Sequence, residues 1–294
     1  MTKFVGTGVA LITPFKKDLT VDFDALETLV NYNIDNGIEY LVISGTTGES
    51  VTITAKEKKE ITDFIIKVNS GRLPLVLGIG GNNTSAVIEE INSTNLSQID
   101  AILSVSPYYS KPTQEGIYQH FKAISEASPI PIILYNVPGR TSKNMEPKTI
   151  LRLANDFENI IAVKEAGNNL GQYLELLKSK PKDFHIISGD DDIALSVALA
   201  GGSGVISVIG QGLPKEFSEM IRNGIAKNAD AAFATHFELM TITNQIFSEN
   251  NPAGIKAVLK SLNISDSYVR LPLVEATDKL KKEISKELNR LGKR

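Results

Sequence analysis

The chain has 294 residues, of which 42% are hydrophobic and 22% are charged, and its formal net charge is −3. This length allows a large buried core, and the lysines are scattered among the acids, which leaves no basic stripe for nucleic acid. Cysteine is absent, which excludes a disulfide framework, a thiol nucleophile and a cysteine metal site. The first residues lack the apolar core of a signal peptide, and no apolar run approaches the ~20 residues that span a bilayer. We therefore expect a soluble, cytoplasmic protein.

Histidine is scarce as well. The three histidines, His120, His185 and His236, lie far apart and lack the spacing of metal ligands. A catalytic zinc usually takes two or three histidines, so a zinc-dependent carbon–carbon lyase is disfavoured. We expect no metal site.

Apolar runs of strand length alternate with amphipathic helical patterns over the first three quarters of the chain. The predicted strands are Gly8–Ile12, Tyr40–Ser44, Leu75–Gly78, Ala101–Val105, Ile132–Asn136, Ile160–Lys164, Phe184–Ser188 and Gly204–Val208. The predicted helices are Asp22–Asp35, Thr54–Asn69, Thr84–Leu96, Gln114–Ala127, Pro147–Asn155, Leu170–Leu177, Ile193–Ala200 and Pro214–Asn223. Eight β-then-α units are the number that closes a (β/α)8 TIM barrel. An open doubly wound sheet competes, but no G-x-G-x-x-G follows the first strand, and Gly6-Thr7-Gly8 precedes it.

The strand pattern stops after about residue 227. Three more helices are predicted at Ala231–Phe247, Ala253–Leu262 and Val274–Leu291. We therefore predict an α/β protein in two parts. Residues 1–226 form a TIM barrel catalytic domain, and residues 227–294 form a C-terminal three-helix appendage.

The apolar run Ile160-Ile161-Ala162-Val163 leads directly into Lys164. An unbroken apolar run between helical patterns is typical of a parallel strand buried on both faces. Burying an ammonium group is costly unless it is paired or loses its proton, and a neutral lysine amine is the nucleophile of Schiff-base chemistry. The simpler interpretation is a lysine just past the strand, solvated or paired with Glu165, and this stretch alone favours it.

Other predicted strand ends, where a TIM barrel carries its chemistry, hold residues suited to recognition. The second ends in Gly45-Thr46-Thr47-Gly48-Glu49, a tight turn whose backbone N–H groups and hydroxyls suit a carboxylate. The fourth leads into Tyr108 and Tyr109 on a loop between prolines, which suits either recognition or simple packing. The fifth ends in Tyr135, which can transfer protons, and Arg140, which can bind a carboxylate through a bidentate fork.

Together these parts supply an amine nucleophile, a phenol, a turn for one carboxylate and an arginine for another. The reaction that uses all of them is Schiff-base formation with a 2-oxo acid, followed by an enamine that attacks an aldehyde with a second acid group. This is a class I aldol-type reaction, for which we expect no metal or organic cofactor.

Three motifs match one known family in order and spacing over nearly the full length. They are Gly45-Thr46-Thr47-Gly48-Glu49, Tyr135-Asn136-Val137-Pro138-Gly139-Arg140-Thr141 and Val163-Lys164-Glu165-Ala166. With them the chain resembles the 4-hydroxy-tetrahydrodipicolinate (dihydrodipicolinate) synthases, within the pyruvate-dependent class I aldolase superfamily that also contains N-acetylneuraminate lyase. The resemblance implies condensation of pyruvate with L-aspartate 4-semialdehyde, the first committed step of lysine and diaminopimelate biosynthesis.

The resemblance also implies catalytic roles. Lys164 would form the Schiff base with pyruvate. Tyr135, Thr47 and Tyr109 would form a proton relay, with Tyr109 acting in the neighbouring subunit's site. Because members of the family are dimers or homotetramers, Tyr108 and Tyr109 would lie at an interface.

Substrate-binding roles follow in the same way. The Thr46–Thr47 turn would hold the pyruvate carboxylate, and Arg140 would hold the carboxylate of the aldehyde. Main-chain groups of Gly189 and Ile206 would line the pocket near the lysine.

Two features depart from the family pattern. After the lysine motif, relatives often carry a small hydroxyl residue and then glycine, whereas this chain continues with Gly167-Asn168-Asn169, which alters the pocket rim. Lysine-inhibited relatives place histidine and glutamate around an interface cleft; the aligned positions here are Ala55, Lys58 and Ala86, while Ser50, Asn82 and Tyr108 remain. With no acid at Ala86 and an added cation at Lys58, a cationic ligand should bind poorly, so we predict weak or absent inhibition by L-lysine.

Two other functions stay open. A sugar-acid lyase or aldolase would share Lys164 and Tyr135, although a neutral polyol has no use for the guanidinium of Arg140. A non-catalytic binding barrel would share the fold alone, but it would be expected to have lost the lysine, the tyrosine or a threonine.

Overall fold

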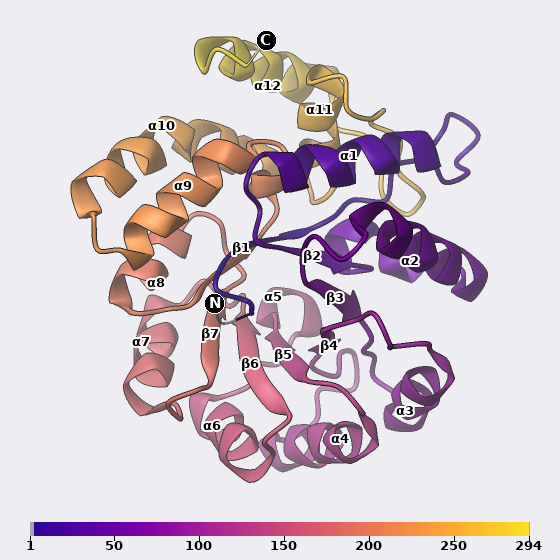
Figure 1. Cartoon of the computed structure of the whole chain (residues 1–294), viewed down its shortest axis with the longest axis vertical. Helices are drawn as coiled ribbons and strands as arrows, with labels where there is room; N and C mark the ends of the chain where they lie inside the picture. Colours follow the sequence, from indigo (N-terminus) through magenta and orange to yellow (C-terminus); the bar gives the residue numbers. More distant parts are fainter. Residues whose placement is uncertain (1–2, 294) are drawn as a thin grey trace.

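A closed barrel of eight parallel strands, arranged in sequence order, forms the centre of the computed structural model, which describes residues 3–293 (Figure 1). The strands are β1 (Gly6–Ala10), β2 (Tyr40–Ile43), β3 (Leu75–Gly78), β4 (Ala101–Val105), β5 (Ile132–Asn136), β6 (Ile160–Glu165), β7 (His185–Ser188) and β8 (Gly204–Ser207). The barrel closes where β1 pairs with β8, from Gly6 opposite Gly204 onwards. The predicted TIM barrel is confirmed.

Helices follow the strands around the outside of the barrel. They are α1 (Phe23–Asp35), α2 (Ala55–Asn69), α3 (Thr84–Ser93), α4 (Gln114–Ala127), α6 (Pro147–Asp156), α7 (Leu170–Ser179), α8 (Ala194–Ala200) and α9 (Pro214–Ile225). Side chains cap several of them: Asp22 accepts from Ala25 N, and Thr54 forms a capping box with Glu57. The short helix α5 (Pro138–Thr141) and the 3₁₀ turns η1 (Thr46–Gly48), η2 (Ser50–Thr52) and η3 (Ile209–Gln211) lie in loops after strands.

Several predicted boundaries need correction by one to four residues, and three of them are instructive. Gly6-Thr7-Gly8 lies within β1 and does not precede it, because pairing with β8 already begins at Gly6. Helix α3 ends at Ser93 and not at Leu96. The last helix, α12 (Asp278–Arg290), begins four residues later than predicted because the side chain of Thr277 caps it by accepting from Leu280 N.

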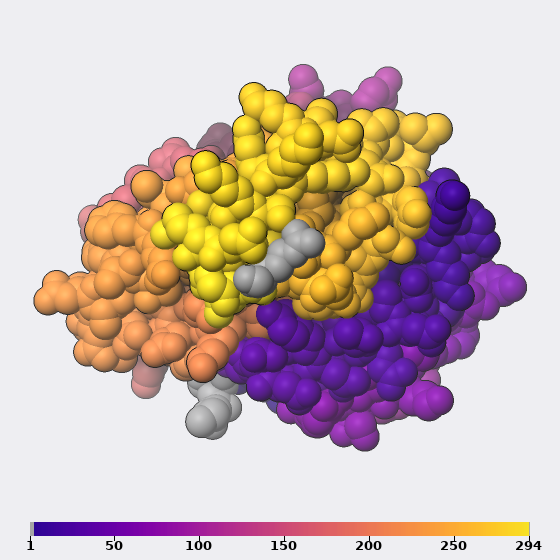
Figure 2. Space-filling view, turned by 90° about the horizontal axis from the view of Figure 1, so that it is seen from above, coloured from indigo at the N-terminus to yellow at the C-terminus, as the bar shows by residue number. Residues whose placement is uncertain are grey.

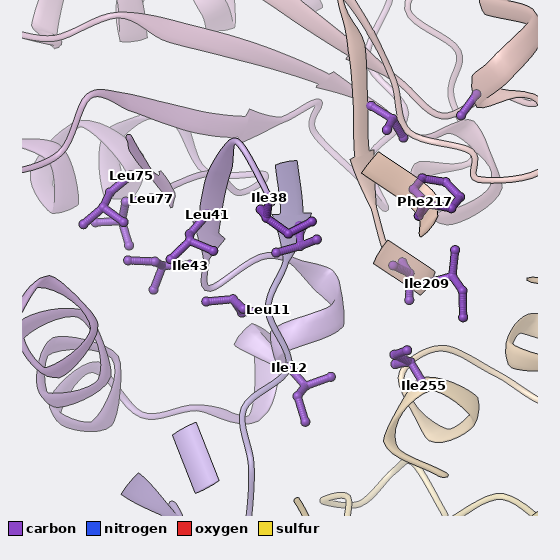
Figure 3. Packing of buried hydrophobic residues seen from close by; sticks show 14 of the residues in the cluster. Leu11, Ile12, Ile38, Leu41, Ile43, Leu75, Leu77, Ile209, Phe217 and Ile255 are labelled. Atoms are coloured by element: carbon purple, nitrogen blue, oxygen red, sulfur yellow. The ribbon is translucent and has the colours of Figure 1, made fainter. Parts of the chain in front are cut away.

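Two hydrophobic clusters account for the buried runs in the strands. Alternate strand residues point inward and fill the barrel, among them Tyr40, Ile133, Tyr135 and Ala162. Their neighbours point outward against the helices; Figure 3 shows such residues on β2 and β3, including Leu41 and Leu77. Strands covered on both faces are hydrophobic throughout, which explains the apolar runs in the sequence.

The C-terminal helices α10 (Ala229–Phe247), α11 (Ala253–Ser261) and α12 extend the outer layer. Ile255 of α11 and Leu288 of α12 belong to the same core cluster as the barrel helices, and Ile255 lies near Ile209 in Figure 3. From above, the C-terminal residues lie against the N-terminal part of the chain (Figure 2). Within residues 3–293, the helices are all too short or too polar to cross a membrane.

Candidate active site

Strands β5 and β6 bring Tyr135 and Lys164 together as direct partners in the strand register. Both side chains follow the inward alternation, because Ile133 and Ala162, two residues earlier, belong to the cluster inside the barrel. Lys164 is 6% exposed, and its Nζ lies 4.5 Å from the centre of the Tyr135 ring. The prediction of a buried lysine at the end of β6 is confirmed.

Glu165 points away from the lysine, on the outer face of β6. Its two carboxylate oxygens accept from Asn136 Nδ2 at 3.1 and 2.8 Å, and Gln172 Nε2 donates to Oε2 at 2.8 Å. Burial raises the pKa of this carboxyl group to about 7, although the hydrogen bonds from Asn136 and Gln172 oppose the shift. A pairing of Lys164 with Glu165 is therefore wrong, because adjacent strand residues face opposite sides of the sheet.

The loop after β7 packs directly on the lysine side chain. A Cβ atom on Gly189 would lie 2.6 Å from Ala166 Cβ and 3.1 Å from Lys164 Cε, so only glycine fits here. The Gly189 N–H donates to Glu165 O at 2.6 Å, which fixes the loop against β6. Ile206 on β8 is fully buried in the same inner cluster as Tyr135. Gly189 therefore borders the lysine side chain, and Ile206 lies inside the barrel with Tyr135.

The predicted carboxylate turn follows β2 as the 3₁₀ helix η1. Gly48 N donates to Gly45 O at 3.1 Å, and Glu49 ends the turn in the left-handed conformation with φ of 55°. Thr47 is 2% exposed, and its hydroxyl is 3.0 Å from Asn251 Nδ2 in the C-terminal part of the chain. Sequence patterns gave no signal for Asn251, because it lies 204 residues from Thr47.

A cavity of about 570 Å³ opens beside this turn. Among its lining residues are Thr46, Tyr135 and Arg140. Arg140 lies on α5, where its backbone N–H donates to Val137 O at 2.8 Å. The cavity therefore joins a turn suited to one carboxylate, a phenol and a guanidinium, as the sequence predicted.

Tyr108 and Tyr109 differ in their placement. Tyr108 is 37% exposed and lines the cavity, whereas Tyr109 is 90% exposed and has a φ of 69°. A bulky residue in the left-handed region carries backbone strain. Tyr109 projects into solvent and is not among the residues that line the cavity of its own chain.

Only some of the residues at the predicted regulatory cleft line this cavity. Ser50, Ala55, Lys58 and Tyr108 line it. Asn82 reaches this region through a hydrogen bond from its Nδ2 to Tyr108 O at 3.3 Å. Ala86 is exposed on α3 and is absent from the cavity lining.

Lys58 has an acidic partner that sequence reasoning missed. Its Nζ forms an ion pair with Glu90, which also lines the cavity, and donates to Gly78 O at 2.6 Å. Glu90 lies one helical turn after Ala86 on α3, so the i, i+4 spacing could have indicated it. The cavity therefore does contain an acidic residue, Glu90, but its carboxylate is already paired with Lys58.

The segment Gly167-Asn168-Asn169, which departs from the family pattern, forms a turn held by hydrogen bonds. Asn168 N donates to Asp190 Oδ2 at 2.9 Å, and Asn169 caps α7 by accepting from Gln172 N. The turn therefore holds Asp190, the residue after Gly189, near the end of β6.

Known proteins match this chain along its whole length. The model of the dihydrodipicolinate synthetase family matches residues 3–291. A 4-hydroxy-tetrahydrodipicolinate synthase of Flavobacterium psychrophilum is 56% identical over 293 residues and covers 100% of both chains. Among solved structures, a dihydrodipicolinate synthase of Thermotoga maritima has a TM-score of 0.97 at 35% identity, with 100% of both chains covered.

Another solved relative is described as the first monomeric dihydrodipicolinate synthase variant. It has a TM-score of 0.96 at 35% identity and covers 99% of this chain and 98% of its own. The sequence matches and the fold matches point to the same family, and the placement of Lys164 beside Tyr135 agrees with the motifs on which the resemblance was based. The chain belongs to the dihydrodipicolinate synthetase family.

Proposed function

We propose that this protein is a lyase that condenses pyruvate with L-aspartate 4-semialdehyde, the activity of a 4-hydroxy-tetrahydrodipicolinate synthase. One observation carries the proposal: the amine of Lys164 is buried inside the barrel at the end of β6, beside Tyr135. A non-catalytic protein that shares only the barrel fold would not need an amine at this position. The names of the relatives support this activity and its place in lysine and diaminopimelate biosynthesis.

The first step is imine formation. The neutral amine of Lys164 attacks C2 of pyruvate, and the carbonyl oxygen leaves as water after two proton transfers. The Thr46–Thr47 turn holds the pyruvate carboxylate during this step. Tyr135 lies next to the amine and is placed to exchange protons with the departing oxygen.

The second step makes the new carbon–carbon bond. Loss of a proton from C3 of the imine gives an enamine, whose C3 attacks the aldehyde carbon while the aldehyde oxygen takes a proton. Arg140 holds the carboxylate of the aldehyde substrate. The amino group of that substrate then attacks C2, closes the ring and displaces the amine of Lys164.

Arg140 separates this activity from that of a sugar-acid lyase. The guanidinium lines the cavity, where it can meet a second carboxylate. A polyhydroxylated aldehyde would leave this charge without a partner. The synthase therefore takes precedence over the sugar-acid lyase.

We further propose that the protein works as a homodimer or as a tetramer of two such dimers. The support is Tyr109, which is 90% exposed on a strained loop next to the cavity-lining Tyr108. Such an aromatic residue suits insertion into a partner's site. The cysteine-free composition fits a cytoplasmic enzyme.

The division at residues 226 and 227 also stays a proposal. It falls between α9, which ends at Ile225, and α10, which begins at Ala229. Because α11 and α12 share the barrel's core cluster, the last part is best regarded as an appendage of one folding unit.

Trapping the imine tests the proposal. Borohydride reduction in the presence of pyruvate should add one reduced pyruvate to the wild-type chain, detected by intact mass. Lys164→Ala should give no adduct, whereas Lys178→Ala, an exposed residue of α7, should give the wild-type adduct. Absence of an adduct on the wild type would favour the binding-barrel alternative.

A further inference from the structure

The C-terminal part of the chain contacts the Gly45–Glu49 turn at two residues. Asn251 Nδ2 donates to Thr47 Oγ1 at 3.0 Å. Lys256 Nζ is 2.5 Å from Glu49 Oε1, and the backbone N–H of Arg270 donates to Glu49 Oε2 at 2.9 Å. Thr47 and Glu49 are therefore both held by residues more than 200 positions later in the sequence.

The ion pair between Lys256 and Glu49 is fully buried, with both side chains 0% exposed. Lys256 Nζ also donates to Tyr268 O at 2.7 Å and lies 4.2 Å from the centre of the Phe15 ring. Burial lowers the pKa of Lys256, and the carboxylate of Glu49 opposes this shift. A buried pair is tolerated only with good geometry and extra hydrogen bonds, and both are present here.

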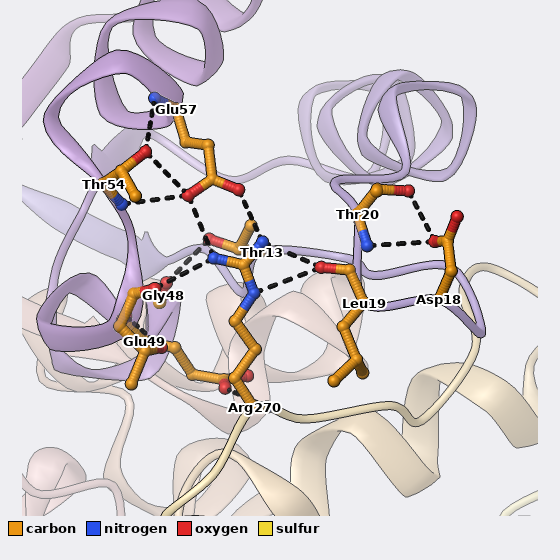
Figure 4. A network of polar contacts seen from close by, with 10 residues as sticks. Thr13, Asp18, Leu19, Thr20, Gly48, Glu49, Thr54, Glu57 and Arg270 are labelled. Atoms are coloured by element: carbon orange, nitrogen blue, oxygen red, sulfur yellow. Dashed lines mark hydrogen bonds and ion pairs between the residues drawn. The ribbon is translucent and has the colours of Figure 1, made fainter.

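Arg270 extends this anchor to the surface (Figure 4). Its guanidinium donates to Thr52 O at 2.9 Å and to Leu19 O at 2.8 Å, and it pairs with Glu57 at 2.5 Å. The hydrogen bond from Arg270 lowers the pKa of Glu57 to about 2. The turn that carries Thr47 is thus held between α2 and the C-terminal segment.

The contact from Asn251 constrains the Thr47 hydroxyl chemically. A hydroxyl has one proton to donate and two lone pairs to accept. Because the amide N–H of Asn251 occupies one lone pair, the hydroxyl proton of Thr47 must point elsewhere. Among the described residues, 3–293, no second hydrogen bond to Thr47 Oγ1 is found, so its other lone pair is free to accept a proton.

The amide of Asn251 has one buried atom without a partner. Its Oδ1 is buried and makes no hydrogen bond within residues 3–293. A buried, unsatisfied carbonyl is unfavourable for stability, and such groups occur in native structures where function requires them.

We propose that Asn251 is a positioning residue that sets the direction of proton donation by Thr47. The proposal rests on the proposed function, in which Thr47 relays protons between tyrosines. In each relay step the Thr47 oxygen accepts one proton on its free lone pair and releases its own, so its protonation state is unchanged. The N–H of Asn251 prevents the hydroxyl from donating back toward residue 251.

Asn251→Asp tests this directly. A carboxylate can only accept, so the Thr47 proton should turn toward it and leave the relay. We expect kcat to fall by about 10- to 100-fold, with the KM for pyruvate within about twofold and the borohydride adduct still formed. The matched control is Asn250→Asp, which adds the same charge one residue away and keeps its acceptor role toward Asn251 N; it should retain wild-type kcat.

A double-mutant cycle with Thr47→Val separates positioning from stability. If Asn251 acts through Thr47, Asn251→Asp should cause no further loss of kcat in the Thr47→Val background. Additive losses, or a wild-type kcat in Asn251→Asp, would overturn the proposal. If thermal unfolding shows that Asn251→Asp does not fold, Asn251→Ala takes its place in the same cycle, with the same criterion.

Failure of this proposal can be told apart from failure of the proposed function. A wild-type chain without a pyruvate adduct would overturn both. An adduct and turnover in the wild type, with additive effects at residues 47 and 251, would overturn the positioning role alone.

Discussion

Tyr135 and Lys164 stand opposite each other in the register of β5 and β6, with the lysine Nζ 4.5 Å from the centre of the tyrosine ring. Because both side chains belong to neighbouring parallel strands, the barrel itself fixes their separation. No loop movement is needed to bring the nucleophile and the phenol together.

Tyr135→Phe should therefore keep the imine chemistry but slow its proton transfers. We expect kcat to fall by about 100-fold, because removing a general acid–base group typically costs 10²–10⁴-fold. The pyruvate adduct should still form on borohydride reduction, at a lower rate. Tyr118→Phe, whose hydroxyl donates to Asp156 on the outside of the barrel, is the control and should keep wild-type kcat.

Arg140→Ala should weaken binding of the aldehyde without changing the reaction of pyruvate. We expect the KM for aspartate 4-semialdehyde to rise by about 10-fold or more, because a charge-assisted bidentate contact is lost. Arg140→Lys should restore little, because an ammonium group cannot reproduce the planar fork. An unchanged KM for the aldehyde in both variants would contradict the assignment.

Mixed dimers can test whether Tyr109 acts in the partner's site. A Tyr109→Phe chain paired with a Lys164→Ala chain assembles one site from an intact lysine and an intact partner tyrosine. When equal amounts of the two chains mix at random, about half of the dimers contain one chain of each kind, and each of these has one complete site. About a quarter of all sites should therefore be active. Activity no higher than that of Tyr109→Phe alone would show that the tyrosine acts within its own chain.

The ion pair between Lys58 and Glu90 should make the enzyme insensitive to L-lysine. Lys58 already supplies a cation to the only acid that lines this side of the cavity in residues 3–293, so an added cationic amino acid finds no free carboxylate there. Initial rates with rising L-lysine should stay constant into the millimolar range. Inhibition at sub-millimolar L-lysine would refute this prediction.

Glu165 should make stability fall as pH rises toward neutrality. Its folded-state pKa of about 7 lies above the ordinary glutamate pKa of 4.5. The protonated form is therefore favoured in the folded state, and this contribution is complete below about pH 4.5 and lost as pH rises through 7. The stability of the wild type relative to Glu165→Gln should decline by about 3 kcal/mol over that window, measured by urea unfolding. A constant difference would contradict the shift.

Local patterns were sufficient to predict much of the fold and several site residues. Lys164, Tyr135 and the Gly45–Glu49 turn follow apolar runs directly, and a strand followed by a helix is visible in a short window. The face of Glu165 could also have been predicted, because neighbouring strand residues point to opposite sides.

Contacts between distant segments could not be predicted in this way. The hydrogen bond from Asn251 to Thr47 and the ion pair between Lys256 and Glu49 depend on how α11 packs on the barrel. No periodicity encodes that packing. The helical pattern from Val274 predicts too early a start for α12, because the decisive signal is the single cap residue Thr277.

The anchor of the Gly45–Glu49 turn has a consequence for protein synthesis. Glu49 leaves the ribosome 207 residues before Lys256 and 221 residues before Arg270. The strand that carries the nucleophile can form earlier, but the turn meets its partners only when Asn251, Lys256 and Arg270 emerge. We expect nascent chains stalled before Asn251 to give no pyruvate adduct, so that catalytic competence arrives only after residues 251–270 have been synthesised.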